Sequence, residues 1–302
     1  MTMSAAGPSQ GANGAPPGGS AAAELANEAA SVGAHQRASQ PLALLAAKGI
    51  TKRFGGVHAL SDVSFTINHG EIYGLIGPNG AGKTSLFNVL TGIYSADDGE
   101  FTFDGLPLLG LKPNEVAARG IARTFQNIRL FANLSALENV MIGRHVRTHA
   151  NVIGAILRDA RTLAEERAIE KRAHELIDYV GVAKRANTLA KHLAYGDQRR
   201  LEIARALATE PKLLALDEPA AGMNATETAS LRSLLGNIRR DGTTILLIEH
   251  DMKLVMSVCD RVLVLDYGKH IAEGTAAEVQ KDPKVIAAYL GGEVTLELKG
   301  AA

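Results

Sequence analysis

Residues 72–91 read IYGLIGPNGAGKTSLFNVLT. The first five form a short apolar run suited to a buried strand, the segment from Gly77 to Thr84 matches GxxxxGK[ST], and SLFNVLT continues as a helix. Glycines let the backbone curl so that successive N–H groups point at phosphate oxygens, and the helix start adds the positive end of its dipole. An ordinary glycine turn is the alternative, but the flanking strand and helix favour a phosphate-binding loop.

Two side chains of this loop have distinct predicted roles. Lys83 is expected to neutralise the β- and γ-phosphates, and the hydroxyl of Thr84 can ligate Mg²⁺. We predict nucleotide contacts from Gly77, Asn79, Gly80, Ala81, Gly82, Lys83, Thr84 and Ser85.

A second element, KLLALDEP at residues 212–219, supplies two acids. Four apolar residues of a predicted buried strand end in Asp217, whose carboxylate would face the Mg²⁺ shell. Glu218 follows and could polarise an attacking water. Taken alone, a strand that ends in two solvated acids is the better interpretation, but a phosphate loop in the same chain makes it the weaker one.

In the segments around these motifs, the spacing of apolar residues indicates an α/β fold with a largely parallel sheet. Residues 42–54 and 61–77 look like strands with a turn at 54–56, and residues 100–108 look like a strand or hairpin after a turn at 97–99. Residues 127–205 look mainly helical. Two capping boxes are predicted, Ser135 with Glu138 and Thr275 with Glu278.

Composition narrows the class of protein. Hydrophobic residues make up 46% of the 302 residues, enough for a sizeable core. Lys+Arg and Asp+Glu both number 32, so zero net charge argues against a general binder of nucleic acid. The one cysteine, Cys259, is predicted to be a small buried side chain in a cytosolic, reducing setting. No apolar run is as long as the roughly 18 residues that a membrane span needs.

The two ends of the chain differ in composition from the region between them. Residues 1–41 are rich in Ala, Gly, Ser and Pro. Ordering such a segment costs roughly 1–2 kcal/mol per residue with little burial in return, so we expect a disordered extension. We expect one domain over residues 42–292 and a short tail over 293–302.

At this point the chain resembles the ATP-binding-cassette ATPases, because several motifs occur in that family's order. Phe54 matches the aromatic that stacks on adenine. Gln126, in ARTFQNIRLF, matches the glutamine that touches Mg²⁺ or the attacking water, and His250, in LLIEHD, matches the histidine at the γ-phosphate. Each is weak alone, since these residue types more often pack, face solvent or play structural roles.

The signature segment also matches the family, but some of its residues differ from the family's motif. LAYGDQRRLEIARAL matches the family's signature helix, with the motif itself at Leu193, Ala194, Tyr195, Gly196 and Asp197. Where the family has LSGGQ, the serine is alanine here and the first glycine is tyrosine. The loop that crosses the dimer, residues 221–224, ends in Asn224 instead of aspartate. These departures put in doubt how well this signature serves a partner's ATP.

The resemblance implies a P-loop NTPase core with a small antiparallel β subdomain and a helical subdomain at about 127–205. Two cassettes would sandwich two ATP molecules, with Glu218 as general base and Asp217, Thr84 and Gln126 at the Mg²⁺. The segments FGGVHALSDVSF and YGDQRRLEIARAL, and an insertion at about 145–164, are most similar to the larger ATP-binding subunit of branched-chain amino-acid importers.

That subgroup implies several partners. They are two transmembrane permease subunits, a second cassette that makes a heterodimer, and, indirectly, a periplasmic substrate-binding protein. The chain would lie peripherally on the cytoplasmic face of the inner membrane. Two alternatives stay open: the same role for urea, amides or other amino acids, and a soluble ATPase of the family that is not a transporter.

Overall fold

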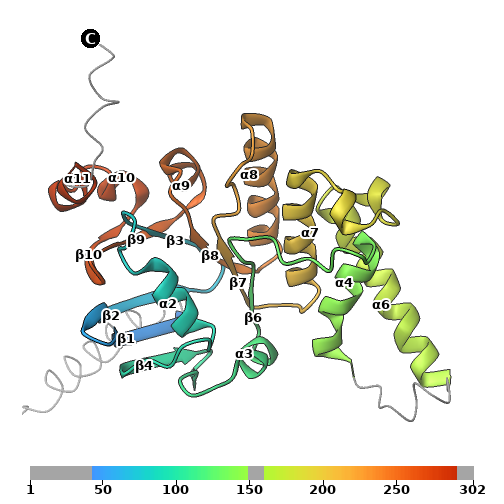
Figure 1. Ribbon diagram of the computed structural model, residues 1–302, viewed down its shortest axis with the longest axis horizontal. Helices are drawn as coiled ribbons and strands as arrows, with labels where there is room; N and C mark the ends of the chain where they lie inside the picture. The colour runs from blue at the N-terminus through green and yellow to red at the C-terminus, as the bar shows by residue number, and fades with distance from the viewer. Residues whose placement is uncertain (1–42, 149–159, 291–302) are drawn as a thin grey trace, which may run out of the picture. The chain divides into compact units, whose positions relative to one another are not determined.

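The computed structural model describes residues 43–148 and 160–290, arranged as two sheets and their helices (Figure 1). The strands are β1 (Ala43–Phe54), β2 (Val57–Asn68), β3 (Ile72–Ile76), β4 (Asp98–Phe103), β5 (Leu106–Pro107), β6 (Ile121–Arg123), β7 (Leu213–Asp217), β8 (Thr244–Ile248), β9 (Arg261–Asp266) and β10 (Lys269–Gly274). The predicted extension at 1–41 and tail at 293–302 lie outside the described residues, and the predicted domain boundaries stay predictions.

The helices fall between and after these strands. They are α2 (Lys83–Leu90), α3 (Pro113–Arg119), α4 (Ala136–Arg144), α6 (Ala160–Tyr179), α7 (Tyr195–Leu207), α8 (Ala225–Arg240), α9 (Met252–Val258), α10 (Ala276–Val279) and α11 (Pro283–Leu290), with short 3₁₀ turns η1 (His145–Arg147), η2 (Ala183–Arg185) and η3 (Ala190–His192). Both predicted capping boxes are present, at the starts of α4 and α10.

The larger sheet has six strands in the order β10-β9-β3-β8-β7-β6. Its strands pair in parallel from β9 through β6, and only the β9–β10 pair is antiparallel. The carboxyl ends of parallel strands meet at one edge, so the loops after β3, β6, β7 and β8 are brought together there. The parallel α/β core expected from the sequence is confirmed.

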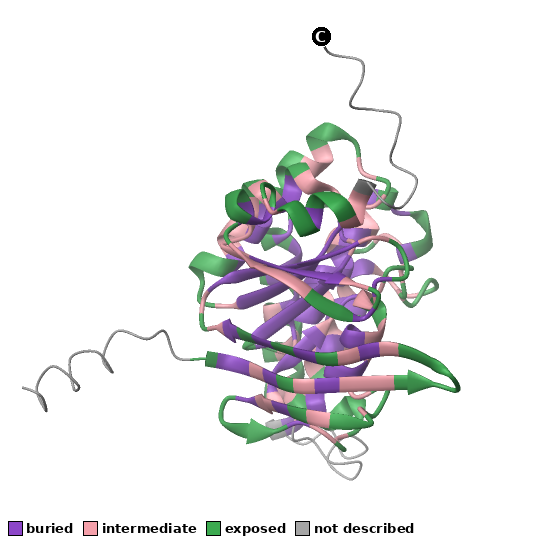
Figure 2. Ribbon diagram, turned by 90° about the vertical axis from the view of Figure 1, so that its left-hand side faces the viewer, coloured by how far each residue is buried: buried purple, intermediate pink, exposed green. Residues whose placement is uncertain are grey.

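Strand β7 shows how this sheet is buried on both faces. Leu213 and Ala215 point to one core, which also holds Phe87 of α2 and Phe101 of the small sheet. Leu214 and Leu216 point to the opposite core, formed by helices α4, α6, α7 and α8. Because successive side chains of a strand point to opposite faces, this unbroken apolar run is buried on both faces. Figure 2 shows the central strands of the sheet in the buried colour, while β10 at its edge is intermediate or exposed.

The smaller sheet is antiparallel, in the order β2-β1-β4-β5. The turn predicted at 54–56 is present between β1 and β2. The turn predicted at 97–99 is partly wrong, because β4 already begins at Asp98, which pairs with Thr51. The reason is local: Asp97 accepts hydrogen bonds from Lys52 Nζ at 2.8 Å and from the backbone N–H of Arg53 at 2.6 Å, which extends the pairing of β4 with β1.

The segment predicted to be mainly helical contains α4, α6 and α7, but residues 127–134 form an irregular loop. The fully buried amide of Asn139 explains this loop. Its Oδ1 accepts from Phe131 N at 2.9 Å, and its Nδ2 donates to the carbonyls of Phe131 and Ser135 at 3.1 and 2.9 Å. The side chain thus satisfies backbone groups that would otherwise continue a helix. Helix α7 runs two residues past the predicted limit, to Leu207.

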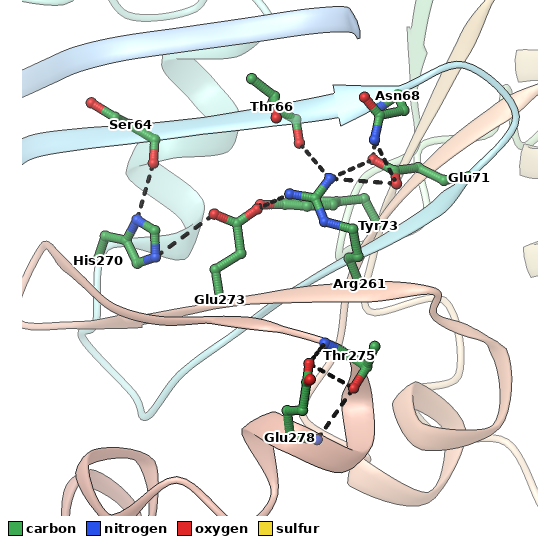
Figure 3. Close-up of polar contacts among 10 residues, drawn as sticks. All are labelled: Ser64, Thr66, Asn68, Glu71, Tyr73, Arg261, His270, Glu273, Thr275 and Glu278. Carbon is green, nitrogen blue, oxygen red and sulfur yellow. Dashed lines mark hydrogen bonds and ion pairs between the residues drawn. The ribbon is translucent and has the colours of Figure 1, made fainter. Parts of the chain in front are cut away.

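One arginine connects the two sheets (Figure 3). Arg261, at the start of β9, donates to Glu71 at 3.3 Å, to Glu273 of β10 and to the carbonyl of Thr66 in β2 at 3.2 Å. Its guanidinium also lies 5.2 Å from the ring centre of Tyr73, whose hydroxyl donates to Glu273 at 2.7 Å. We call Arg261, Glu71, Tyr73 and Glu273 the inter-sheet cluster.

Among the described residues, no helix has both the length and the apolar character to cross a bilayer. Cys259 packs against Gly74, where an added Cβ would lie 3.0 Å from its Sγ, and burial raises the pKa of its thiol to about 12. Cys259 is partly buried, so it is less enclosed than expected, and its low reactivity stays a prediction.

Candidate active site

The loop between β3 and α2 has a backbone that only glycine can follow at two points. Gly77 has φ 150°, and a Cβ there would lie 2.2 Å from the carbonyl oxygen of Leu265. Gly82 has φ 99°, and its Cβ would lie 2.6 Å from the carbonyl oxygen of Ala59. The strands β2 and β9 therefore press against the loop and fix its curl, as a phosphate cradle requires.

Lys83 begins α2 directly after this loop. Its Nζ donates to the carbonyls of Gly77 and Pro78, at 2.6 and 3.0 Å. Burial lowers the pKa of Lys83, and the carboxylates of Glu218 and Asp217 act in the opposite direction. The ammonium thus lies where the loop, the helix start and two acids meet.

Asp217 closes strand β7 and is 6% exposed. Burial raises the pKa of its carboxyl, while the nearby Arg123 guanidinium opposes that rise. Arg123 is itself packed between two rings, 4.4 Å from the centre of Phe87 and 4.5 Å from that of Phe125. A buried acid at the end of a strand, facing a cationic loop, is chemically suited to ligating a divalent cation.

Two predicted residues from different loops approach the carboxylate of a third, Glu218. Gln126 Nε2 donates to Glu218 Oε2 at 3.0 Å. His250 Nδ1 lies 3.7 Å from the same oxygen. The loops after β6, β7 and β8 bring these side chains together, as the parallel sheet predicts.

Glu218 also has an unusual backbone. Its φ is 48°, in the left-handed region that costs a residue with a side chain of this kind of order 1–3 kcal/mol. Its N–H donates to Ile248 O at 2.9 Å, and its carbonyl accepts from Ala221 N at 3.2 Å. The backbone on both sides therefore holds the carboxylate in place.

Lys83, Gln126 and Glu218 line a cavity of about 410 Å³, whereas Asp217 and His250 are not part of its lining. It is lined by Val57, His58, Ala59, Asn79, Gly80, Ala81, Gly82, Lys83, Thr84, Ser85, Gln126, Glu218 and Tyr267. The donors fit a nucleotide with its metal, since the loop supplies N–H groups and an ammonium, while hydroxyl, amide and carboxylate oxygens are ligands that Mg²⁺ accepts. In the residues described, no cluster of three His, Cys, Asp or Glu side chains offers an alternative metal site.

Two outcomes at this cavity were not expected. Phe54 does not line it; the ring is 43% exposed and meets Tyr94 edge to face, with centres 5.2 Å apart. Tyr267, which is 84% exposed with φ 44°, does line it and was missed. An exposed tyrosine in the Asp-Tyr-Gly turn after β9 was the available signal, but its proximity depends on the β9–β3 pairing.

The signature residues lie elsewhere. Ala194 is the N-cap of α7 and makes no side-chain bond there, Leu193 is buried beside it, and Asp197 lies in the helix's first turn. Gly196 is tightly packed, since a Cβ there would lie 2.6 Å from Glu227 Oε1. None of residues 193–197 lines the described part of the cavity.

The crossing loop ends at the start of α8. Asn224 caps that helix, accepting from Glu227 N at 3.0 Å while Glu227 Oε2 accepts from Asn224 N at 2.9 Å. Asparagine and aspartate are comparable N-caps, so this departure from the family pattern leaves the loop's local structure intact.

Comparison with known proteins agrees with this geometry. The family model "ABC transporter" matches residues 60–221, and the model "Branched-chain amino acid ATP-binding cassette transporter" matches residues 269–295. The chain is 46% identical, over 84% of its length and 99% of the relative's, to the high-affinity branched-chain amino acid transport ATP-binding protein LivG of Salmonella typhimurium. It is 44% identical to BraF of Pseudomonas aeruginosa, named with the same function, over 82% and 98% of the two chains.

A solved structure supports the same assignment. The ADP conformation of MJ1267, an ATP-binding cassette of an ABC transporter, superposes with a TM-score of 0.72 at 32% identity, over 83% of this chain and 99% of that one. The phosphate loop, the converging acid, amide and imidazole, and these matches lead to one conclusion. The chain belongs to the ABC transporter family, as one of its ATP-binding, ATP-hydrolysing cassettes.

Proposed function

We propose that this cassette powers the import of branched-chain amino acids through two separate transmembrane permease subunits, on the cytoplasmic face of the inner membrane. The observation that carries the cargo is the match of residues 269–295 to a model specific to branched-chain amino-acid cassettes. The named function of LivG and BraF supports it, because those matches extend over nearly the whole of each relative.

Hydrolysis is assigned to residues that line the cavity and to Asp217, which lies outside its lining. Lys83 neutralises charge on the transferring phosphoryl group. Thr84, Asp217 and Gln126 would hold Mg²⁺, which would supply further neutralisation of the phosphate charge when bound. Glu218 accepts the proton of the attacking water, and a positioned general base of this kind typically contributes about 10²–10⁴ in rate.

Two further residues complete the nucleotide site in this proposal. His250 donates to the γ-phosphate from its place 3.7 Å from Glu218. Phe54 contacts adenine; its exposed ring, at the end of β1, supports this role, although it stands outside the cavity's lining.

The nucleotide site needs a second cassette. The described lining of the cavity includes none of residues 193–197, which supports a signature helix supplied by a partner chain. Ala194 lacks the hydroxyl that a serine would offer. A hydrogen bond to a charged group is worth about 1.5–3 kcal/mol, so the ATP facing this signature would be held less well. We infer a heterodimer with unequal sites, in which the site on Lys83 and Glu218 does most of the hydrolysis.

A groove of about 440 Å³ is assigned to the permease. It lies between α3, the segment after β6, and helices α4 and α7, and its rim exposes Ile93, Phe131 and Val146 at 44%, 50% and 42%. Apolar side chains exposed around a concave site are typical of a protein contact. A short permease segment in this groove would touch the residues beside Gln126, which links transport to the cavity. The cargo, captured by a periplasmic binding protein, does not touch this chain.

Uptake measurements test the cargo. A strain lacking this chain is complemented with the wild type or with Glu218→Gln, and uptake of radiolabelled leucine, isoleucine and valine is measured at submicromolar concentration. The wild type should restore uptake of all three, and Glu218→Gln should not. Unchanged uptake in the deletion strain, together with a defect for urea or another solute, would reassign the cargo.

A further inference from the structure

Helix α7 carries a nearly fully buried arginine whose role is not explained by packing alone. Arg199 is 3% exposed, and its Nη1 donates to the carbonyl of Phe125 at 2.8 Å. Its Nη2 donates to the carbonyl of Gln126. The guanidinium thus clamps two successive carbonyls of the segment that presents the Gln126 side chain to Glu218. Planar guanidinium forks are suited to such paired recognition, and a lysine is not.

The same guanidinium is held from its other side by Tyr195. The tyrosine hydroxyl accepts from Arg199 Nε at 3.2 Å and from Nη2 at 2.8 Å, with the guanidinium 5.3 Å from the ring centre. The tyrosine ring lies against the crossing loop, because a Cβ added at Gly222 would be 3.1 Å from a ring carbon. Tyr195 therefore touches the crossing loop at one edge and Arg199 at its hydroxyl.

A carboxylate completes this arrangement. Glu202 is 1% exposed; its Oε2 lies 3.5 Å from Arg199 Nη1, and its Oε1 accepts from Arg129 N at 2.8 Å. Arg205 adds a bond from Nη1 to the carbonyl of Arg129 at 2.6 Å. Helix α7 thus holds both ends of the segment from Phe125 to Arg129, through the buried Arg199 and Glu202 and the partly exposed Arg205. Hydrogen bonds that involve charged groups are stronger and more geometrically specific than those between neutral groups.

We propose that Tyr195 and Arg199 are positioning residues that hold Gln126 against Glu218 within the same chain and tie this contact to the crossing loop at Gly222. The tyrosine in place of the signature's first glycine thereby acts in cis, on this chain's own hydrolysis site, as well as facing the partner's ATP. The proposal rests on the roles proposed above for Gln126 and Glu218. Movement of the crossing loop at the dimer interface would be transmitted to Gln126 through the ring of Tyr195 and the guanidinium of Arg199.

The test uses the reconstituted transporter with its companion cassette. Tyr195→Phe removes only the hydroxyl that holds Arg199, and it is placed in two backgrounds. In one, the companion's catalytic glutamate is replaced by glutamine, so the site on Lys83 and Glu218 does the hydrolysis. In the other, Glu218→Gln leaves hydrolysis to the companion's site. Action in cis predicts a loss of kcat of roughly three- to tenfold in the first background and a clearly smaller loss in the second.

Two readouts separate positioning from a general loss of structure. Because Gln126 is proposed to touch Mg²⁺, half-saturation by Mg²⁺ should rise about threefold or more, while KM for ATP changes less than about twofold. Arg199→Lys keeps the charge beside Glu202 but loses the fork, so it should reproduce the kcat loss with an unchanged circular-dichroism spectrum. Tyr179→Phe is the matched control. The Tyr179 hydroxyl, at the carboxyl end of α6, donates to Asp241 at the C-cap of α8 at 2.6 Å, and its removal should leave kcat unchanged.

Two patterns of result would overturn the proposal. Equal losses in the two backgrounds, or a larger loss where Glu218 is replaced, would mean that Tyr195 acts on the partner's ATP. Unchanged kcat for Tyr195→Phe, or a loss matched by Tyr179→Phe, would reduce the contact to packing. A complex that hydrolyses ATP but carries no leucine would contradict the proposed cargo and leave this comparison intact.

Discussion

Replacing Arg261 by methionine should destabilise the cassette, because it removes the only cation of the inter-sheet cluster within the described residues. Methionine keeps the length of the side chain and its contact with the ring of Tyr73. It removes the cationic partner of Glu71 and Glu273, whose side chains are 10% and 19% exposed. Glu71 keeps only its hydrogen bonds from Asn68, and Glu273 keeps the one from Tyr73. Breaking a buried pair typically costs about 3–5 kcal/mol. The arginine is itself 30% exposed, so we expect about 2–3 kcal/mol here.

The loss should depend on pH in a defined direction. Burial already raises the pKa of Glu71, and Arg261 opposes that rise. Without the arginine the pKa of Glu71 rises further, so the folded variant binds a proton that the unfolded chain releases at lower pH. The variant's stability is then retained at low pH and lost as pH rises through the pKa of folded Glu71. The destabilisation should be larger at pH 8 than at pH 5.

Urea denaturation at both pH values, followed by circular dichroism, measures the two differences. Arg239→Met is the matched control. Arg239 donates to Gly70 O at 3.0 Å and pairs with Asp260 at 2.9 Å, but its side chain is 43% exposed. Its replacement should therefore lower the free energy of unfolding by no more than about 1 kcal/mol. A loss for Arg261→Met no greater than the control's, or one that grows as pH falls, would refute this account of the cluster.

Three further results are expected. Lys83→Ala should abolish ATP hydrolysis, whereas Glu218→Gln should still bind ATP in a fluorescent-nucleotide titration and lose about 10²–10⁴ in kcat; normal turnover would remove Glu218 from the base role. Deleting residues 1–40 should leave the melting temperature and ATPase rate largely unchanged, because that composition offers little apolar surface to bury, and a large drop would show docking. Cys259, with its pKa raised to about 12, should react with a disulfide reagent at pH 8 at least about 100-fold more slowly in the folded protein than in urea; equal rates would contradict its burial.

The parts of the fold that could be predicted are those whose signal is local. The alternation in KLLALD, the glycine spacing before Lys83 and the capping box at Ser135 each depend on residues a few positions apart. They predicted β7, the start of α2 and the start of α4 without knowledge of the rest of the chain. The turn at 97–99 was partly mispredicted because Asp97 is tied to Lys52, which lies 45 positions away.

The candidate site divides in the same way. Glu218 was found from the KLLALDEP motif, and Gln126 and His250 were found through family resemblance. The parallel sheet explains why their three loops bring Gln126 and His250 close to one carboxylate oxygen of Glu218. Their roles stay predictions. The contacts of Tyr195 could not be predicted, because the substitution reads as the loss of a glycine until Arg199 is seen beneath it. A buried guanidinium leaves little trace in sequence, since arginine at a helical position is ordinarily solvated.

The left-handed backbone at Glu218 has a consequence for engineering and for evolution. Glycine or asparagine would adopt φ 48° at lower conformational cost than glutamate, so a selection for thermostability alone should favour replacing the residue that the reaction needs. Variants recovered by such a selection would be well folded and catalytically silent. A duplicated copy of this gene that is no longer selected for ATP turnover would be expected to change early at the codon for Glu218. Its product would be a cassette that still pairs and closes around ATP but does not hydrolyse it to reopen.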